Sequence, residues 1–320
     1  MNYSPILLVS GEPNSIFLEI YFKILKINKV KSPLILISSE KLLKLQMKKL
    51  NFKKRIKIIN PSSLDQYSFN NKSINLIDVK YDPVKAFEKA SKKSNIYIKK
   101  SFDIAFNVLK RGYIKKFING PVSKKKFLNS KFLGITEYIS KAFSEKKTCM
   151  LIYNNTLSVC PVTTHLPIKL VSQKINKKNI SDKVFLINDF YLKKFGFRPK
   201  IAILGLNPHC ESVHKYNEDD KIIKPTIKYL KTKYNVSGPY SADTIFLKNN
   251  RKKFNVIIGM YHDQVLTPLK TLFEYDAINI TLGLPFDRIS PDHGPNEKML
   301  GKNISNPLSL LRAIQFLDKH

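Results

Sequence analysis

The feature that most constrains this chain is the alternation of short apolar runs, rich in β-branched residues, with segments of helical periodicity. The predicted strands are PILLVSG, SPLILISS, RIKIIN, INLIDV, KKFING, TLSVCPVTT, KIAILGLNP, FNVIIGM and AINITLG. Amphipathic segments such as 15–27, 40–50 and 182–196 lie between them. Because strands that alternate with helices usually pair in parallel, we predict an α/β fold with largely parallel sheets.

Helix boundaries can also be predicted from the local residues. The segments 82–93 and 101–112 are predicted as two separate helices, and 182–196 is expected to end at Gly196. Asn306 is a candidate N-cap for the final helix, and Pro307 suits its first turn.

Length and targeting signals set the broad class. Single hydrophobic cores stop growing at roughly 250–300 residues. Because this chain has 320 residues, two lobes are expected. No apolar run approaches the roughly 20 residues that span a bilayer, and the N-terminus reads as a first strand, not a signal peptide. Cys149, Cys160 and Cys210 are too few and too scattered for a disulfide framework, so we expect a cytoplasmic protein.

The net charge of +32 has two explanations. A basic chain can bind nucleic acid, and that alternative rests on the charge alone. Lys and Arg are, however, spread along the whole chain, together with abundant Asn and Ile, which favours solvated surfaces from a general composition bias. In either case the positive field would attract anionic substrates and nucleotide cofactors.

Three of the six histidines follow predicted strands directly. They are His165, His209 and His262. Because ligands of open α/β sheets bind outside the carboxyl ends of strands, these imidazoles are candidate ligands of one catalytic metal. Asp243 and Asp263 are candidate carboxylates that would orient an imidazole. Each of these residues could instead serve only its local turn.

Further polar residues follow His262 along the chain. Asn279 stands inside a predicted strand, an unusual place for an amide without a function. Arg288 and Lys270 could hold anionic groups, Arg through a planar fork and Lys as a point charge. In so lysine-rich a chain, Lys270 could equally be a solvated surface residue.

These residues belong to motifs that occur together, in one order, in a known family. The motifs are GEPNSIFLEI, NGPVSKKKF, GITEYIS, VTTHLPIKLV, ILGLNPHCE, GPYSADTIF, GMYHDQVLTPLK, NITLGLPFDR and DHGPNEKMLGK. The chain resembles the 4-hydroxythreonine-4-phosphate dehydrogenases, NAD-dependent enzymes of pyridoxal phosphate biosynthesis. The resemblance implies a divalent metal (zinc, or magnesium, manganese or cobalt) at His165, His209 and His262. It implies substrate contacts at Thr136, Lys270, Asn279 and Arg288.

The resemblance also implies an architecture. The family fold has two α/β/α lobes, like the isocitrate and isopropylmalate dehydrogenases, with the active site in the interdomain cleft. A homodimer completes the site, with metal ligands from both subunits. We expect a cofactor-side lobe of residues 1–125 plus 275–320, and a metal, substrate and dimerisation lobe of residues 126–274. The tail DHGPNEKMLGKNISNP resembles the adenine-side cofactor loop of the wider isocitrate and isopropylmalate dehydrogenase superfamily, which implies cofactor contacts at His293, Gly294 and Asn306. No GxGxxG fingerprint is present, so the NAD cofactor rests on the resemblance alone, and the choice between NAD and NADP stays open.

The implied reaction oxidises 4-phosphohydroxy-L-threonine to a β-keto acid that loses CO2 to give 3-amino-2-oxopropyl phosphate, with the general base unassigned. One departure bears on the substrate: Ile135 stands where the family has a histidine before Thr136. A related dehydrogenase of another phosphorylated hydroxy acid is therefore an alternative, as are a nucleic-acid-binding protein and a non-catalytic relative.

Overall fold

The computed structural model describes residues 3–27, 29–123, 127–128, 132, 134–291, 294 and 296–319. The chain forms two compact units, residues 1–143 with 285–320 and residues 144–284. Both junctions lie later in the chain than the lobe boundaries expected from the sequence, at 125/126 and 274/275.

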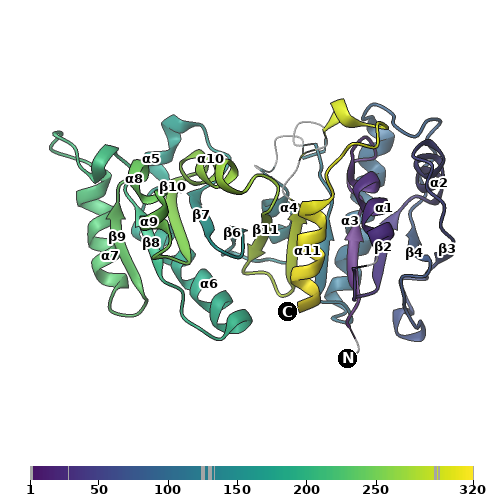
Figure 1. The fold of residues 1–320 in the computed structure, drawn as a ribbon, viewed down its shortest axis with the longest axis horizontal. Coiled ribbons are helices and arrows are strands. Elements are labelled where there is room, and N and C mark those ends of the chain that lie inside the picture. Colours follow the sequence, from purple (N-terminus) through teal and green to yellow (C-terminus); the bar gives the residue numbers. More distant parts are fainter. Residues whose placement is uncertain are drawn as a thin grey trace. The chain divides into compact units, whose positions relative to one another are not determined.

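The first unit is built on a parallel sheet (Figure 1). Its strands are β1 (Ile6–Val9), β2 (Leu34–Ser38), β3 (Ile56–Ile58), β4 (Ile74–Asp78), β5 (Lys116–Asn119) and β12 (Asp287–Pro291), in the order β3-β4-β2-β1-β5-β12. The registered pairs are all parallel. Every side chain of β1 is fully buried, which explains why this strand reads as a continuous apolar run.

Helices cover this sheet. They are α1 (Phe17–Ile27), α2 (Glu40–Lys49), α3 (Lys92–Lys110), α4 (Ile135–Ala142) and α11 (Leu308–Lys319), with short 3₁₀ turns at Leu64–Gln66 and Glu297–Met299. Parallel crossovers are right-handed, so α1 and α2, which carry the chain toward β3, lie on one face. Helix α3 carries it back toward β5 and therefore lies on the other face. Helix α11 packs beside α1 and against β12.

The helix predicted over 82–93 is wrong for most of its length. Residues 82–91 form bends and irregular backbone, and a single helix, α3, replaces the two predicted ones. The Glu88 carboxylate accepts the backbone amides of Val84, at 2.5 Å, and Lys85, at 3.0 Å, which folds this segment into a turn. Helix α3 begins only after Ser91, whose hydroxyl accepts the amide of Ser94 at 3.2 Å.

The second unit has a mixed sheet. Its strands are β6 (Cys149–Tyr153), β7 (Ser158–Thr163), β8 (Ile201–Leu204), β9 (Val236–Tyr240), β10 (Val256–Tyr261) and β11 (Ile278–Leu282), in the order β11-β6-β7-β10-β8-β9. The β11–β6 and β6–β7 pairs are antiparallel, and the other pairs are parallel. The predicted α/β class with largely parallel sheets is confirmed. Strands β6, β9 and β12 were not predicted.

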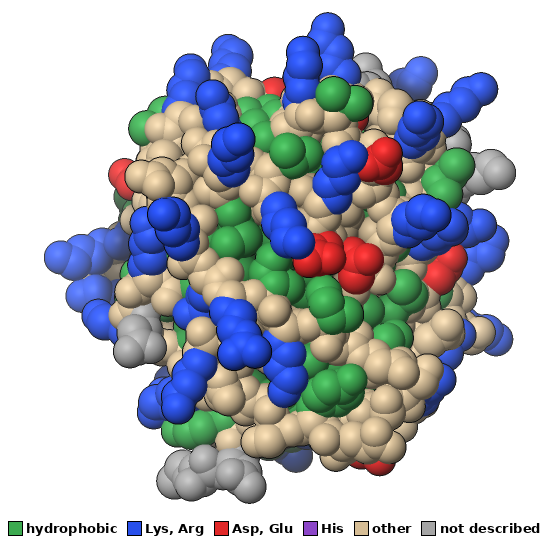
Figure 2. Space-filling model, turned by 90° about the vertical axis from the view of Figure 1, so that its right-hand side faces the viewer, with side chains coloured by type: hydrophobic (Ala, Val, Ile, Leu, Met, Phe, Trp, Pro, Cys, Tyr) green, Lys and Arg blue, Asp and Glu red, His purple; other side chains and the backbone are tan. Residues whose placement is uncertain are grey.

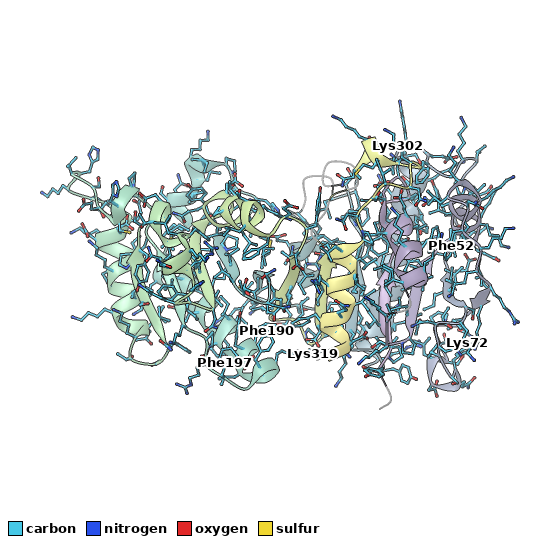
Figure 3. All side chains as sticks on the ribbon, viewed as in Figure 1. Phe52, Lys72, Phe190, Phe197, Lys302 and Lys319 are labelled. Atoms are coloured by element: carbon cyan, nitrogen blue, oxygen red, sulfur yellow. The ribbon has the colours of Figure 1, made fainter. Side chains whose placement is uncertain are left out.

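The helices of the second unit follow its parallel strands. They are α5 (Val171–Lys174), α6 (Lys177–Phe195), α7 (Lys224–Leu230), α8 (Ala242–Ile245), α9 (Lys248–Arg251) and α10 (His262–Phe273), with short helical turns at Ile168–Leu170, Pro208–Cys210 and Asp219–Ile223. Helix α6 ends as predicted at Gly196, which has the left-handed φ of 76°. The end of α6 carries an aromatic cluster, and Figure 3 shows Phe190 and Phe197 at this end of the unit.

The surface reflects the basic composition. Figure 2 shows a face of the first unit on which Lys and Arg side chains are scattered among apolar and neutral atoms, not gathered into one continuous patch. The residues described above include no helix both long and apolar enough to cross a membrane.

Candidate active-site residues

The three candidate metal ligands follow three neighbouring strands. His165 lies two residues after β7, His262 begins α10 immediately after β10, and His209 lies five residues after β8. Strand β10 pairs in parallel with both β7 and β8. All three histidines therefore emerge at the same edge of the second unit's sheet, where parallel strands end.

Two of these imidazoles lie side by side. The ring centroids of His165 and His262 are 5.8 Å apart. Nδ1 of His262 lies 2.7 Å from a carboxylate oxygen of Asp263, which leaves Nε2 as the nitrogen available to a ligand. His209 does not join this pair: in the part of the chain that the structure describes, no three His, Cys, Asp or Glu side chains lie close enough together to hold a metal ion.

His209 sits on a sharply bent loop. Its φ is 55°, in the left-handed region that non-glycine residues rarely adopt. Asp243, on α8, has a lowered pKa, mainly because the Ser241 hydroxyl donates a 2.5 Å hydrogen bond to it and partly because of the nearby His209. The carboxylate of Asp243 therefore lies close enough to His209 for the two groups to interact electrostatically.

The residue that shapes this loop, Asp219, was missed in the sequence analysis. Its carboxylate is fully buried and accepts the backbone amides of Leu206, at 2.9 Å, and Asn207, at 3.0 Å. The side-chain amide of Asn207 donates a third hydrogen bond, at 2.8 Å. A Cβ on Gly205 would lie 2.6 Å from this carboxylate, so a glycine is required there. An acidic residue soon after a Gly-Leu-Asn-Pro turn was the available sequence signal.

We expect Asp219→Asn to destabilise the protein by about 2–4 kcal/mol, because an amide nitrogen would face backbone N–H donors in a buried position. The free energy of unfolding, measured by urea denaturation, tests this. Glu218→Gln is the matched control, since the half-buried Glu218 makes only a 3.2 Å contact with the Asn207 amide and keeps an acceptor oxygen as glutamine. Equal stability of the two variants would contradict a clamping role for Asp219.

Asn279 and Lys270 also belong to the second unit. Asn279 pairs with Ile152 in the β11–β6 ladder, and its Oδ1 is buried without a hydrogen-bond donor among the described residues. A buried acceptor oxygen of this kind suits a ligand that brings a donor. Lys270 lies half-buried on α10, eight residues after His262.

The other substrate candidates, Thr136 and Arg288, meet in the first unit. The Arg288 side chain is fully buried on β12. Its Nε donates to Oδ1 of Asn119, at 2.8 Å, and Nη1 donates to the Thr136 hydroxyl, at 3.2 Å. Asn119 ends β5 and was missed in the sequence analysis, although the strand-end argument applied to the histidines would have selected it.

Burial changes the electrostatics of this guanidinium. Loss of hydration lowers the pKa of Arg288 to about 10, while the charge of Glu137 acts in the opposite direction. Arg288 therefore remains a cation at neutral pH, in surroundings where an anionic group would be attracted strongly. Ile135, the departure from the family pattern, begins α4 directly before Thr136.

The implied cofactor contacts all fall near the C-terminus of the first unit. His293 lies outside the described residues. Gly294 is exposed, and nothing within 4 Å would obstruct a Cβ there. The side chain of Asn306 accepts the amide of Leu308 at 2.9 Å, so it caps α11 as predicted.

Comparison with known proteins gives consistent matches. The family model of the "Pyridoxal phosphate biosynthetic protein PdxA" matches residues 29–317. A 4-hydroxythreonine-4-phosphate dehydrogenase from Sulfurihydrogenibium sp. (strain YO3AOP1) is 38% identical over 318 residues, which covers 95% of this chain and 94% of that protein. A D-threonate 4-phosphate dehydrogenase from Pectobacterium atrosepticum is 30% identical over 76% of each chain.

A solved structure has the same fold. The 4-hydroxythreonine-4-phosphate dehydrogenase from Klebsiella pneumoniae superposes with a TM-score of 0.83 over 98% of each chain, at 24% identity. This similarity covers both units of the chain.

Proposed function

Because the chain belongs to the family of the pyridoxal phosphate biosynthetic protein PdxA, we propose that it oxidises 4-phosphohydroxy-L-threonine with NAD and that the product loses CO2. The relative from Sulfurihydrogenibium carries the name of this activity. The buried, cationic Arg288 is the single observation that most supports it, because a phosphorylated hydroxy acid brings the anionic groups that such a site attracts.

Substrate binding in this proposal uses four polar side chains. Arg288 and Lys270 hold the phosphate and the carboxylate, and the Thr136 hydroxyl supports both the guanidinium and the substrate. Oδ1 of Asn279 accepts a hydrogen bond from the substrate's ammonium or hydroxyl group, which supplies its missing donor.

A divalent metal fits the histidine residues as a shared site. The imidazoles of His165 and His262 come from one chain, and we propose that His209 comes from the second chain of a homodimer. Asp263 would hold His262 in the tautomer that binds through Nε2. When bound, the metal would supply Lewis acidity at the substrate's hydroxyl oxygen.

The proposed reaction has two steps. When bound, NAD would accept a hydride from the carbon that bears the hydroxyl group; with release of the hydroxyl proton, this would leave a ketone β to the carboxylate. The bond to the carboxylate then breaks, CO2 departs, and the electron pair is taken up by the ketone before the α-carbon is protonated. Arg288, Lys270 and Asn279 keep the reacting carbon fixed through these steps.

Product identification tests the proposal. Purified protein with NAD, a divalent metal and 4-phosphohydroxy-L-threonine should yield NADH, CO2 and 3-amino-2-oxopropyl phosphate in equal amounts. NADH without CO2 would contradict the decarboxylation, and no NADH under any metal would contradict the proposed activity.

The second candidate is a dehydrogenase of another phosphorylated hydroxy acid, such as D-threonate 4-phosphate, after the name of the Pectobacterium relative. Ile135 is the observation that favours it, because an isoleucine at the start of α4 cannot form the hydrogen bond that histidine can. A buried polar group left without its partner costs about 1–3 kcal/mol, or roughly a tenfold to hundredfold loss of affinity.

Ile135→His distinguishes the two substrates. If the family substrate is the native one, the variant should turn it over as well as or better than wild type, because the added imidazole supplies a hydrogen bond. If the substrate has changed, wild type should be inactive on 4-phosphohydroxy-L-threonine. The substitution should then impair the reaction with the native substrate. Steady-state NADH production by both proteins on both phosphorylated acids measures this, with Ile139→Val, a buried change on the same helix, as control.

A further inference from the structure

An ion pair on α1 anchors the chain segment that leads to Asn306. Glu19 and Lys23 lie one helical turn apart, and their charged atoms are 3.0 Å apart. The Glu19 side chain is only 1% exposed and that of Lys23 is 23% exposed. Because buried charges are costly unless they are paired and hydrogen-bonded, this pair needs further partners.

Those partners come from the C-terminal segment. The Lys23 ammonium donates to the carbonyl oxygens of Asn303, at 3.0 Å, and Ser305, at 2.7 Å. Together with the bond to Glu19, these contacts use all three N–H donors of the ammonium. The same oxygen of Glu19 also accepts the backbone amide of Ser305, at 2.7 Å. The N–H group and the carbonyl group of Ser305 are therefore both hydrogen-bonded to side chains of α1.

The shape of the segment explains why it needs this anchor. Gly301 and Asn303 both have left-handed φ values, of 70° and 59°. They form a tight turn between the 3₁₀ turn at Glu297–Met299 and helix α11, which Figure 3 shows with Lys302 on the turn and Lys319 at the far end of the helix. Asn306 directly follows the anchored Ser305. Its side chain accepts a hydrogen bond from the backbone amide of Leu308, which holds it on the α11 side.

We propose that Glu19 and Lys23 are positioning residues for dinucleotide binding, which they support by fixing the backbone that presents Asn306. The inference rests on the proposed function for the use of a dinucleotide and of Asn306. Neither charged group needs to touch the cofactor, because the contacts run from α1 to the backbone of residues 303–305 and from there to Asn306.

The test combines three variants with a matched control. Glu19→Gln weakens the acceptor, Lys23→Met removes all three donors, and Lys23→Arg restores a cation. The control is Glu40→Gln with Lys44→Met on α2, an ion pair of the same spacing, 2.7 Å apart, that lies on a more exposed surface.

Hydrogen exchange and NAD affinity are the two main measurements. We expect about tenfold faster amide exchange in the peptide that contains Ser305, and about fivefold to tenfold weaker NAD binding by calorimetry, for Glu19→Gln and Lys23→Met, from the loss of charge-assisted hydrogen bonds. Lys23→Arg should recover much of both. The KM for NAD should rise while kcat and the KM for the phosphorylated substrate stay close to wild type.

Each outcome decides between support and rejection. Faster exchange with unchanged NAD affinity would overturn the inference, as would a control pair with the same effects or a wild-type protein that binds no dinucleotide. If Glu19→Gln does not fold, Lys23→Met and Lys23→Arg decide it, since Lys23 is partly exposed. Wild-type protein that binds NAD but does not oxidise the substrate would refute the proposed function and leave this inference intact.

Discussion

Replacement of Arg288 by methionine is expected to lower kcat/KM by about a thousandfold, because it removes the buried cation proposed to pair with an anionic group of the substrate, and loss of one partner of such a pair costs about 2–5 kcal/mol. The structural basis is the fully buried guanidinium that Asn119 and Thr136 hold in place. Arg288→Lys should recover only part of the activity, since an ammonium lacks the planar fork. Steady-state kinetics with the phosphorylated substrate measures both.

Two controls separate binding from folding. Arg55→Met removes an exposed arginine directly before β3 and should leave kcat/KM unchanged. Thermal unfolding of Arg288→Met should show a folded, cooperative protein, because methionine can fill much of the same volume in a well-packed site. Wild-type kinetics in a folded Arg288→Met protein would exclude Arg288 from substrate binding.

The second large effect concerns the histidines. His165→Ala, His209→Ala and His262→Ala should each lose the bound metal and nearly all activity, because each removes one of the ligands proposed for a single ion. Metal analysis of the purified proteins measures this directly. Metal content equal to wild type in His209→Ala would contradict the shared site.

Mixing the inactive variants tests how the ligands are divided between subunits. His165 and His262 lie together in one chain, and His209 does not join them among the described residues. Mixed and re-associated His165→Ala and His209→Ala proteins should therefore regain about a quarter of wild-type activity, since half of the dimers are mixed and each of these has one intact site.

The matched control is the pair His165→Ala with His262→Ala. Its mixed dimers should stay inactive, because each site lacks one of the two ligands that come from the same chain. Recovery in this pair but not with His209→Ala would show that the division of ligands is different. A protein that is monomeric by light scattering at micromolar concentration would refute the shared site altogether.

Local sequence patterns were enough to predict strands from apolar runs and helix ends from capping residues. The nine predicted strands are present; an apolar run of β-branched residues has few alternatives to a buried strand, and only β3, at the edge of the sheet, is largely exposed. Gly196 and Asn306 end and begin helices as predicted, because capping depends on residues within one turn. The prediction over 82–93 is wrong because Glu88 binds the local backbone and competes with the helix.

For the candidate histidines, the sequence is sufficient to predict which edge of the sheet they reach. His165, His209 and His262 follow strands, and chain direction alone sends them to the carboxyl ends. Which residues contact one another could be learned only from the folded chain. Asn119 contacts Arg288 across 169 positions of sequence because β12 pairs with β5, and Glu19 contacts Ser305 across 286 positions because α11 packs beside α1. Such contacts depend on strand order and helix packing, which no local pattern encodes.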